Sequence, residues 1–238
     1  MIQHLLQLIW NQRKQNAWLW AELLLVSVFL WFLVDYLYVM GRTYTAPLGF
    51  DIRHTYSIVI SSLSERSPDY IPKEKRERPD GVHLLTALDR IRTYPGVESA
   101  CLTDGGMPYY MGSRNLVWRI DTLQVPCRYA FVTPEFFDVF RIYDKDGKTA
   151  SLKRAIEDNN SIVISADVET MNPGLSLLGQ KAYRGNVTDE IEETIRGISV
   201  PIRRHEYTKA EPNVYRALRL SRMEEGYYEG MIDAVRLC

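Results

Sequence analysis

The side chains that could do chemistry are few in this sequence, and they lie far apart. His4, His54, His83 and His205 have no second ligand at the spacing that metal sites use. Ser199 lies in the segment GISVP, which lacks the second glycine of the GxSxG turn that presents a nucleophilic serine. We therefore expect no catalytic residue, no metal ligand and no cofactor-binding residue in this chain.

Carboxylates, asparagines and aromatic residues are weaker candidates. Asp104 and Glu135 could approach other carboxylates in space, but the sequence predicts no acid–base pair. Residues 159–161 and 186–188 match the N-glycosylation triplet, a pattern that is common by chance. The phosphate-binding pattern GxxxxGK[ST] is missing, so we expect no nucleotide hydrolysis by the chain itself. The aromatic cluster is predicted to be core rather than a ligand platform, and it contains Tyr129, Phe131, Phe136, Phe137 and Phe140.

The composition is that of a globular protein rather than a disordered one, with 46% hydrophobic and 25% charged residues among 238. The formal net charge of −1 provides no global field for nucleic acid, so we expect no nucleic-acid partner. Cys101, Cys127 and Cys238 are too few for a disulfide framework. A Cys101–Cys127 disulfide and a pair of buried thiols both remain open at this point.

Residues 17–39 form an apolar segment, AWLWAELLLVSVFLWFLVDYLYV, with tryptophans at one end and tyrosines at the other. At about 1.5 Å per residue the segment reaches ~34 Å, enough to cross a hydrocarbon core of ~30 Å. Glu22 and Asp35 lie near its ends, where a carboxylate costs less than the ~2.5–3.5 kcal/mol of the bilayer centre. The uncharged residues 23–34 would also suit a cleaved signal peptide. We expect a retained transmembrane helix over residues 17–41.

Residues 1–16 place Ile2, Leu5, Leu6 and Ile9 at helical spacing between polar residues. This pattern predicts an amphipathic helix in the membrane interface, or equally an extension of the transmembrane helix. The basic residues on either side of the apolar segment are balanced, so they indicate no orientation.

Short strands and short helices alternate irregularly after residue 41, which is typical of the α+β class. We expect a solvated loop over residues 64–80 and helices over 81–94, 134–140 and 166–171. We expect strands over residues 54–62, 97–103, 115–121, 126–133, 161–165, 191–202 and 213–220. The first strand, helix and second strand would make a βαβ-like unit.

Four segments, in this order, resemble the periplasmic core domain of ABC transporter permeases of the MacB and FtsX type. They are YAFVTPEFFDVF (129–140), SIVISADVETMNPGLSLLGQKAY (161–183), IRGISVPIRRHEY (195–207) and EPNVYRAL (211–218). Two positions depart from the family pattern, because Gln180 replaces the usual lysine and Ala217 the usual proline.

The resemblance implies a transmembrane helix followed by a two-lobed mixed α+β extracytoplasmic domain over residues 42–238. A βαβ-like lobe would cover 44–103, an inserted mixed lobe about 104–220, and an incomplete returning strand would lie within 221–238. The family's N-terminus is cytoplasmic. Family members carry three further membrane helices, and the sequence has no second apolar segment of that length, so we expect a fragment of a longer protein.

The function implied is that of a mechanotransmission permease subunit, not an enzyme. Such a subunit couples ATP hydrolysis by a cytoplasmic ABC ATPase to export or substrate extraction outside the cytoplasm. Implied partners are the ATPase, membrane lipid, a second permease in a homodimer or heterodimer, and a periplasmic adaptor, all at the bacterial inner membrane. The alternative is the ligand-sensing extracytoplasmic domain of a signalling protein, which would need a concave pocket with converging polar groups.

Overall fold

The chain forms two compact units in this computed structural model, residues Met1–Ala46 and Pro47–Cys238. The structure describes residues 17–60, 63–72, 75–110, 112, 114–185, 190–225 and 235–238, with Gln3, Gln7, Trp10, Asn11 and Lys14. The amphipathic pattern predicted for residues 1–16 depends on Ile2, Leu5, Leu6 and Ile9, which lie outside the described residues.

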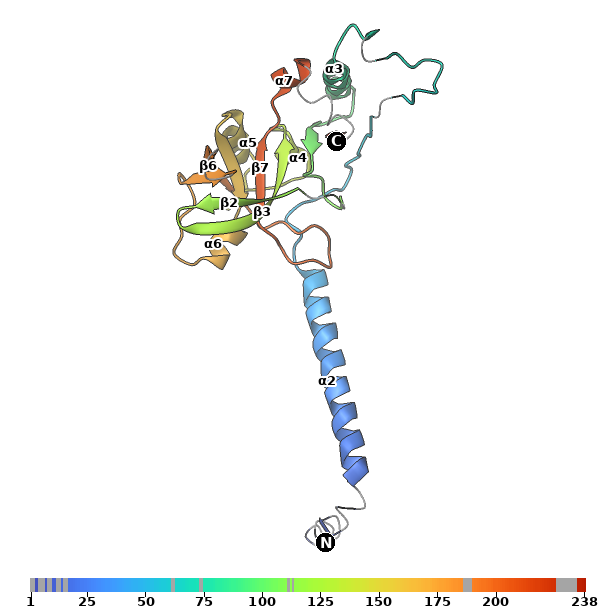
Figure 1. The fold of residues 1–238 in the computed structure, drawn as a ribbon, viewed down its shortest axis with the longest axis vertical. Helices are drawn as coiled ribbons and strands as arrows, with labels where there is room; N and C mark the ends of the chain where they lie inside the picture. The colour runs from blue at the N-terminus through green and yellow to red at the C-terminus, as the bar shows by residue number, and fades with distance from the viewer. Residues whose placement is uncertain are drawn as a thin grey trace. The chain divides into compact units, whose positions relative to one another are not determined.

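The first unit contains the helix α2 (Ala17–Thr45), drawn in blue in Figure 1. The predicted helix over residues 17–41 is confirmed, and it continues for one more turn. Thr45 closes this turn, because its hydroxyl donates a hydrogen bond to the Gly41 carbonyl at 3.0 Å. By length and composition α2 can cross a membrane, and each of its residues is exposed or partly exposed within the protein.

The second unit is built on one eight-stranded mixed sheet in the order β2-β5-β6-β4-β7-β3-β1-β8, with β2 also pairing with β3. The pairs β3–β7 and β4–β6 are parallel, and the remaining pairs are antiparallel. The strands are β1 (Leu102–Asp104), β2 (Asn115–Ile120), β3 (Leu123–Val132), β4 (Ser161–Ser165), β5 (Lys181–Arg184), β6 (Ile191–Ser199), β7 (Asn213–Ala217) and β8 (Val235–Leu237).

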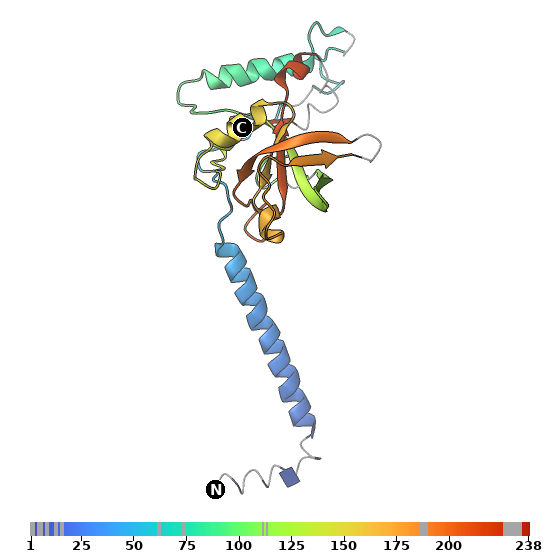
Figure 2. The same ribbon diagram turned by 90° about the vertical axis from the view of Figure 1, so that its left-hand side faces the viewer.

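Short helices pack around this sheet, and Figures 1 and 2 show α3 and α7 side by side. The helices are α3 (Asp80–Arg92), α4 (Phe136–Val139), α5 (Ala150–Glu157), α6 (Asp167–Met171) and α7 (Leu220–Glu224). One core cluster joins Phe136, Phe137 and Phe140 to Leu152 of α5 and Tyr215 of β7. The aromatic residues of α4 are therefore core, as predicted, whereas Tyr129 and Phe131 are only partly buried.

A glycine lets α5 approach the sheet closely. A Cβ atom on Gly197 of β6 would lie 2.8 Å from Val163 Cγ2 and 3.1 Å from Ala155 Cβ. Because contacts under 3.0 Å do not occur without movement, only glycine fits between α5 and β4 at this position.

The strand predicted over residues 54–62 is wrong. Among the described residues 54–60 only Ile58 pairs, in an isolated antiparallel bridge with Leu237, and His54 has a positive φ of 62°. β-branched side chains favour a strand only where a neighbouring strand satisfies the backbone, and β8 offers this segment a single residue. The strand predicted over 97–103 is likewise reduced to β1.

The Ile58–Leu237 bridge gives one feature of the predicted βαβ-like unit, the parallel direction of its two outer segments. Ile58 and β1 both run antiparallel to β8, so they are parallel to each other with β8 between them. β1 also pairs with β3, so residues of the predicted first lobe continue the sheet of the predicted inserted lobe. The division into two lobes stays a prediction.

Candidate functional site

A groove of about 900 Å³ opens on the second unit beside α4. Its walls come from the segment around His54 and Tyr56, from residues 96–100 before β1, and from α4 and α5. The groove is large enough to accept side chains of a partner protein, and His54, Tyr56, Glu135, Asp138, Lys153 and Cys238 are among its lining residues.

Two carboxylates of this groove, Asp138 and Glu135, have charge partners beside them. Asp138 accepts a hydrogen bond from the Thr149 hydroxyl at 2.6 Å and pairs with Lys153 at 2.5 Å. Glu135 pairs with Arg92 at 2.8 Å. Each of these carboxylates therefore already has a cation or hydroxyl beside it, an arrangement suited to holding a surface in shape rather than to acid–base catalysis.

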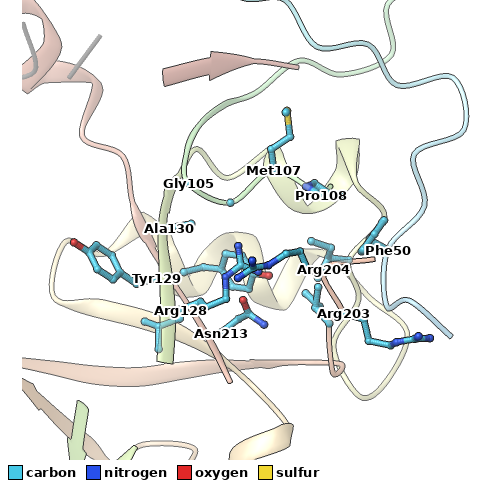
Figure 3. Close-up of a pocket in the computed structure, with 15 residues that line it drawn as sticks. Phe50, Gly105, Met107, Pro108, Arg128, Tyr129, Ala130, Arg203, Arg204 and Asn213 are labelled. Carbon is cyan, nitrogen blue, oxygen red and sulfur yellow. The ribbon is translucent and has the colours of Figure 1, made fainter. Parts of the chain in front are cut away.

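A second, smaller pocket lies where the Gly105–Gly106 turn approaches β3 and the loop after β6 (Figure 3). Its internal volume is about 20 Å³, room for roughly one water molecule. Figure 3 shows Arg128 of β3 and Arg204 of the loop extending toward each other in this pocket. Gly105 has a positive φ of 84°, which suits the tight turn at the pocket wall.

The electrostatics of the small pocket are dominated by these two guanidinium groups. Burial, with a contribution from Arg204, lowers the pKa of Arg128. Within the described part of the chain, Arg128 Nε is buried without a hydrogen-bond partner. Among the described residues, the carboxylate paired with Arg204 is that of Glu211, at 3.9 Å. The positive charge here is thus incompletely compensated, and the space suits a water molecule or one atom of an anion.

The pocket's size bears on the ligand-sensing alternative. Converging polar groups are present, as that alternative requires, but small-molecule sites usually enclose ~300–1,000 Å³. A volume of about 20 Å³ is too small for such a ligand, whereas the groove beside α4, at about 900 Å³, lies within that range.

The residues considered from the sequence are placed apart. Ser199 is buried on β6, and its hydroxyl donates to the Val200 carbonyl at 3.1 Å. Asp104 is buried beside Arg114, with 3.0 Å between the paired atoms. Among the residues that the structure describes, no group of three or more His, Cys, Asp or Glu side chains could hold a metal ion. The triplet 186–188 lies outside the described residues, and glycosylation at 159–161 stays a prediction.

The Cys101–Cys127 disulfide is not formed. Cys127 lies in the cluster around Trp118 and Ile162, whereas Cys101 lies in the cluster around Phe136. Burial raises the pKa of the Cys127 thiol to about 12, so this thiol is unreactive.

The sequence reasoning missed a buried ionic cluster on the sheet. Glu193 of β6 lies between Arg216 of β7 and Arg184 of β5, and its side chain is only 3% exposed. The alternation along β6 could have predicted the burial of Glu193, because successive side chains of a strand point to opposite faces of the sheet. Glu193 lies on the same, buried face of β6 as Ile195, Gly197 and Ser199.

No family model and no curated protein matches this chain. Solved structures similar to it include three that each match over 64% of this chain. A domain of a protein named as a permease from Porphyromonas gingivalis has 19% identity and a TM-score of 0.45. The periplasmic region of MacB from Actinobacillus actinomycetemcomitans has 9% identity and a TM-score of 0.39. The extracellular domain of the noncanonic ABC-type transporter YknZ, from Gram-positive bacteria, has 12% identity and a TM-score of 0.42.

The chain spans 58% of the first of these structures, 62% of the second and 71% of the third. The first of these proteins is described as a permease, the second is MacB, and the third is described as an ABC-type transporter.

Proposed function

We propose that this chain is the N-terminal part of a permease subunit of an ABC transporter of the MacB and FtsX type. One observation carries the proposal: the four motif segments, scattered over residues 129–218, supply five adjacent strands. These strands are β5, β6, β4, β7 and β3, in that order across the sheet. Segments that share a family pattern and also form one continuous structural unit support a common fold better than isolated matches.

The surface of α2 supports membrane anchoring. Its leucine, valine, phenylalanine and tryptophan side chains are largely exposed within the protein, for example Leu24 at 68% and Trp31 at 70%. An apolar surface of this size needs lipid or partner helices around it. We infer that α2 spans the bacterial inner membrane with its N-terminus in the cytoplasm, and that residues 47–238 fold in the periplasm.

In the proposed mechanism, ATP is hydrolysed in the cytoplasm and the resulting motion acts on the extracytoplasmic side of the membrane. A cytoplasmic ABC ATPase would hydrolyse ATP, and the permease helices would transmit its motion to the extracytoplasmic domain. α2 suits transmission, because it runs through 29 residues with proline at no position and glycine only at Gly41. The chain itself would not act as an enzyme. Two permease copies, alike or different, would enclose the path, and the groove beside α4 would receive a periplasmic adaptor.

The direct test is capture of the ATPase. The natural full-length product is purified in mild detergent, and the preparation is assayed for ATP hydrolysis and for an ABC ATPase by mass spectrometry. Residues 1–16 are the part expected nearest to the ATPase, so their deletion should reduce capture. A groove substitution, Tyr56→Ser, is the control and should leave capture unchanged.

Two results would contradict the proposal. One is a well-folded, membrane-inserted product that captures no ATPase. The other is tight binding of a small ligand by residues 47–238 without any ATPase, which would favour the sensing alternative.

A further inference from the structure

Cys101 and Cys238 lie directly opposite each other at the edge of the sheet, although they are far apart in the sequence. The Cys101 N–H donates to the Cys238 carbonyl at 2.7 Å, and the Cys238 N–H donates to the Cys101 carbonyl at 2.9 Å. This exchange continues the β1–β8 register that pairs Leu102 with Leu237. Residues paired in this way have Cα atoms about 5.5 Å apart, within the ~4.4–6.8 Å range of disulfides.

The two thiols also meet on one face of the sheet. The Cys238 thiol is close enough to raise the pKa of Cys101, and Cys238 Sγ lies 3.7 Å from Met107 Sδ. Side chains of directly opposed residues in an antiparallel pair project to the same side of the sheet, so the two sulfur atoms face the same space.

The cysteines differ in access. Cys101 is completely buried, whereas Cys238 is partly exposed and lines the groove beside α4. The neighbouring Cys238 thiol, followed by burial, raises the pKa of Cys101. A reagent from solution therefore reaches the Cys238 sulfur first, and Cys101 acts second.

We propose that Cys101 and Cys238 form a reversible cross-strand disulfide that ties β8 to β1. The oxidant is a disulfide, either a small molecule or a thiol oxidase of the extracytoplasmic compartment. The Cys238 thiolate attacks one sulfur of that disulfide, giving a mixed disulfide and releasing one thiol. The Cys101 thiolate then attacks Cys238 Sγ and displaces the second thiol. Two protons and two electrons leave the cysteine pair, and the oxidant is reduced to two thiols.

The bond would have a structural consequence. β8 spans three residues in the sheet and pairs with β1 on one side and, among the residues placed in the structure, with Ile58 alone on the other. A covalent link closes a long loop of the chain and restricts the unfolded state, which stabilises the folded one. We expect oxidation to raise the midpoint of thermal unfolding and reductant to lower it again.

Cys127 supplies a matched control, because it is buried in a different cluster. The purified full chain is incubated with oxidised glutathione, and thiols are counted after denaturation, with peptide mapping by mass spectrometry. The wild type should fall from three thiols to one, become lighter by two hydrogen atoms, and yield a peptide joining Cys101 to Cys238. Cys127→Ser should fall from two thiols to none, and Cys101→Ser should retain Cys127 and carry glutathione on Cys238.

The proposal is overturned if folded wild type keeps three thiols in excess oxidised glutathione, or if the mapped bond involves Cys127 or a second chain. Mapping of the wild type needs no variant, so a misfolded serine variant cannot obscure the answer. The oxidant is added in solution, so a negative result leaves the permease proposal intact, and a failure to capture the ATPase leaves the disulfide intact.

Discussion

Glu193 is a buried carboxylate that neutralises the charge of two arginines, Arg184 and Arg216. Its Oε1 accepts from Arg216 Nε at 2.8 Å and from Nη2 at 2.5 Å, and its Oε2 lies 3.5 Å from Arg184 Nε. The exposed fractions are 3% for the Glu193 side chain, 14% for Arg216 and 21% for Arg184. Burial lowers the pKa of Arg216, and the Glu193 charge opposes that effect.

The substitution Glu193→Gln keeps the shape of the side chain and removes its charge. Two largely buried guanidinium groups then lose their counter-ion, which costs about 3–5 kcal/mol. For a folded unit of this size, about 2–4 °C is lost per kcal/mol, so the midpoint should fall by about 6–20 °C. The control is Glu192→Gln on the same strand. Glu192 is 47% exposed and pairs with the exposed Lys181, so its loss should cost ~1 kcal/mol or less.

Thermal unfolding of the full chain in detergent, followed by tryptophan fluorescence, measures both variants. Trp118 is completely buried, whereas Trp10, Trp18, Trp20 and Trp31 are exposed within the protein, so the unfolding signal comes from Trp118. The reasoning is refuted if Glu193→Gln unfolds within 2 °C of Glu192→Gln, because the cluster would then contribute no more than a surface pair.

Three further predictions concern burial, packing and insertion. Burial raises the pKa of Asp167 above its usual 3.8. The buried carboxylate therefore lowers the free energy of unfolding at pH values above the folded-state pKa, where it is charged. This loss of stability disappears below pH 3.8, where Asp167 is protonated in both the folded and the unfolded state. Asp167→Asn should therefore be more stable than wild type at pH 7, with the gain fading in denaturant titrations toward pH 4. Gly197→Ala places a Cβ atom 2.8 Å from Val163 Cγ2 and should cost about 1–3 kcal/mol in urea unfolding, and a neutral result would contradict the close packing of α5. Leu30→Arg at the middle of α2 should weaken membrane insertion by about 2.5–3.5 kcal/mol and increase the fraction released by alkaline carbonate. Leu19→Arg near the end of α2 should release less, and equal release would argue against a membrane-spanning helix.

Local sequence patterns predicted the secondary structure correctly where the hydrophobic spacing within the segment is strong. β4 has the predicted bounds, because Ser161–Ser165 has three β-branched residues at its centre and is buried along its whole length. α3 was predicted from the spacing of Leu84 and Leu88, and both pack in one core cluster. The predicted class, an apolar N-terminal helix followed by a mixed α and β unit, is confirmed.

Sequence patterns gave the wrong secondary structure where contacts with a distant part of the chain determine it. Residues 54–62 have strand composition, but β8 pairs with only one residue of the part that the structure describes, 54–60. α5 was missed because its apolar face, Leu152, Ala155 and Ile156, is too short to show a helical period.

The site depended even more on long-range contacts. Arg128 meets Arg204 only because β3 and the loop after β6 come together, and spacing along the chain does not indicate this. The Cys101–Cys238 pair likewise follows from β8 returning beside β1, whereas the pair considered from the sequence was Cys101 and Cys127.

The most direct test of the central claim is protease accessibility in intact bacterial spheroplasts. The full chain carries an epitope tag at residue 1, and added trypsin is followed by blotting for the tag and for residues 47–238. We predict cleavage within the exposed, basic segment around Lys75 and Arg78 without lysis, while the tag survives until the membrane is ruptured. Protection of residues 47–238 until lysis, digestion of the tag in intact spheroplasts, or a mature protein that begins near Arg42 would contradict a retained anchor with an extracytoplasmic domain.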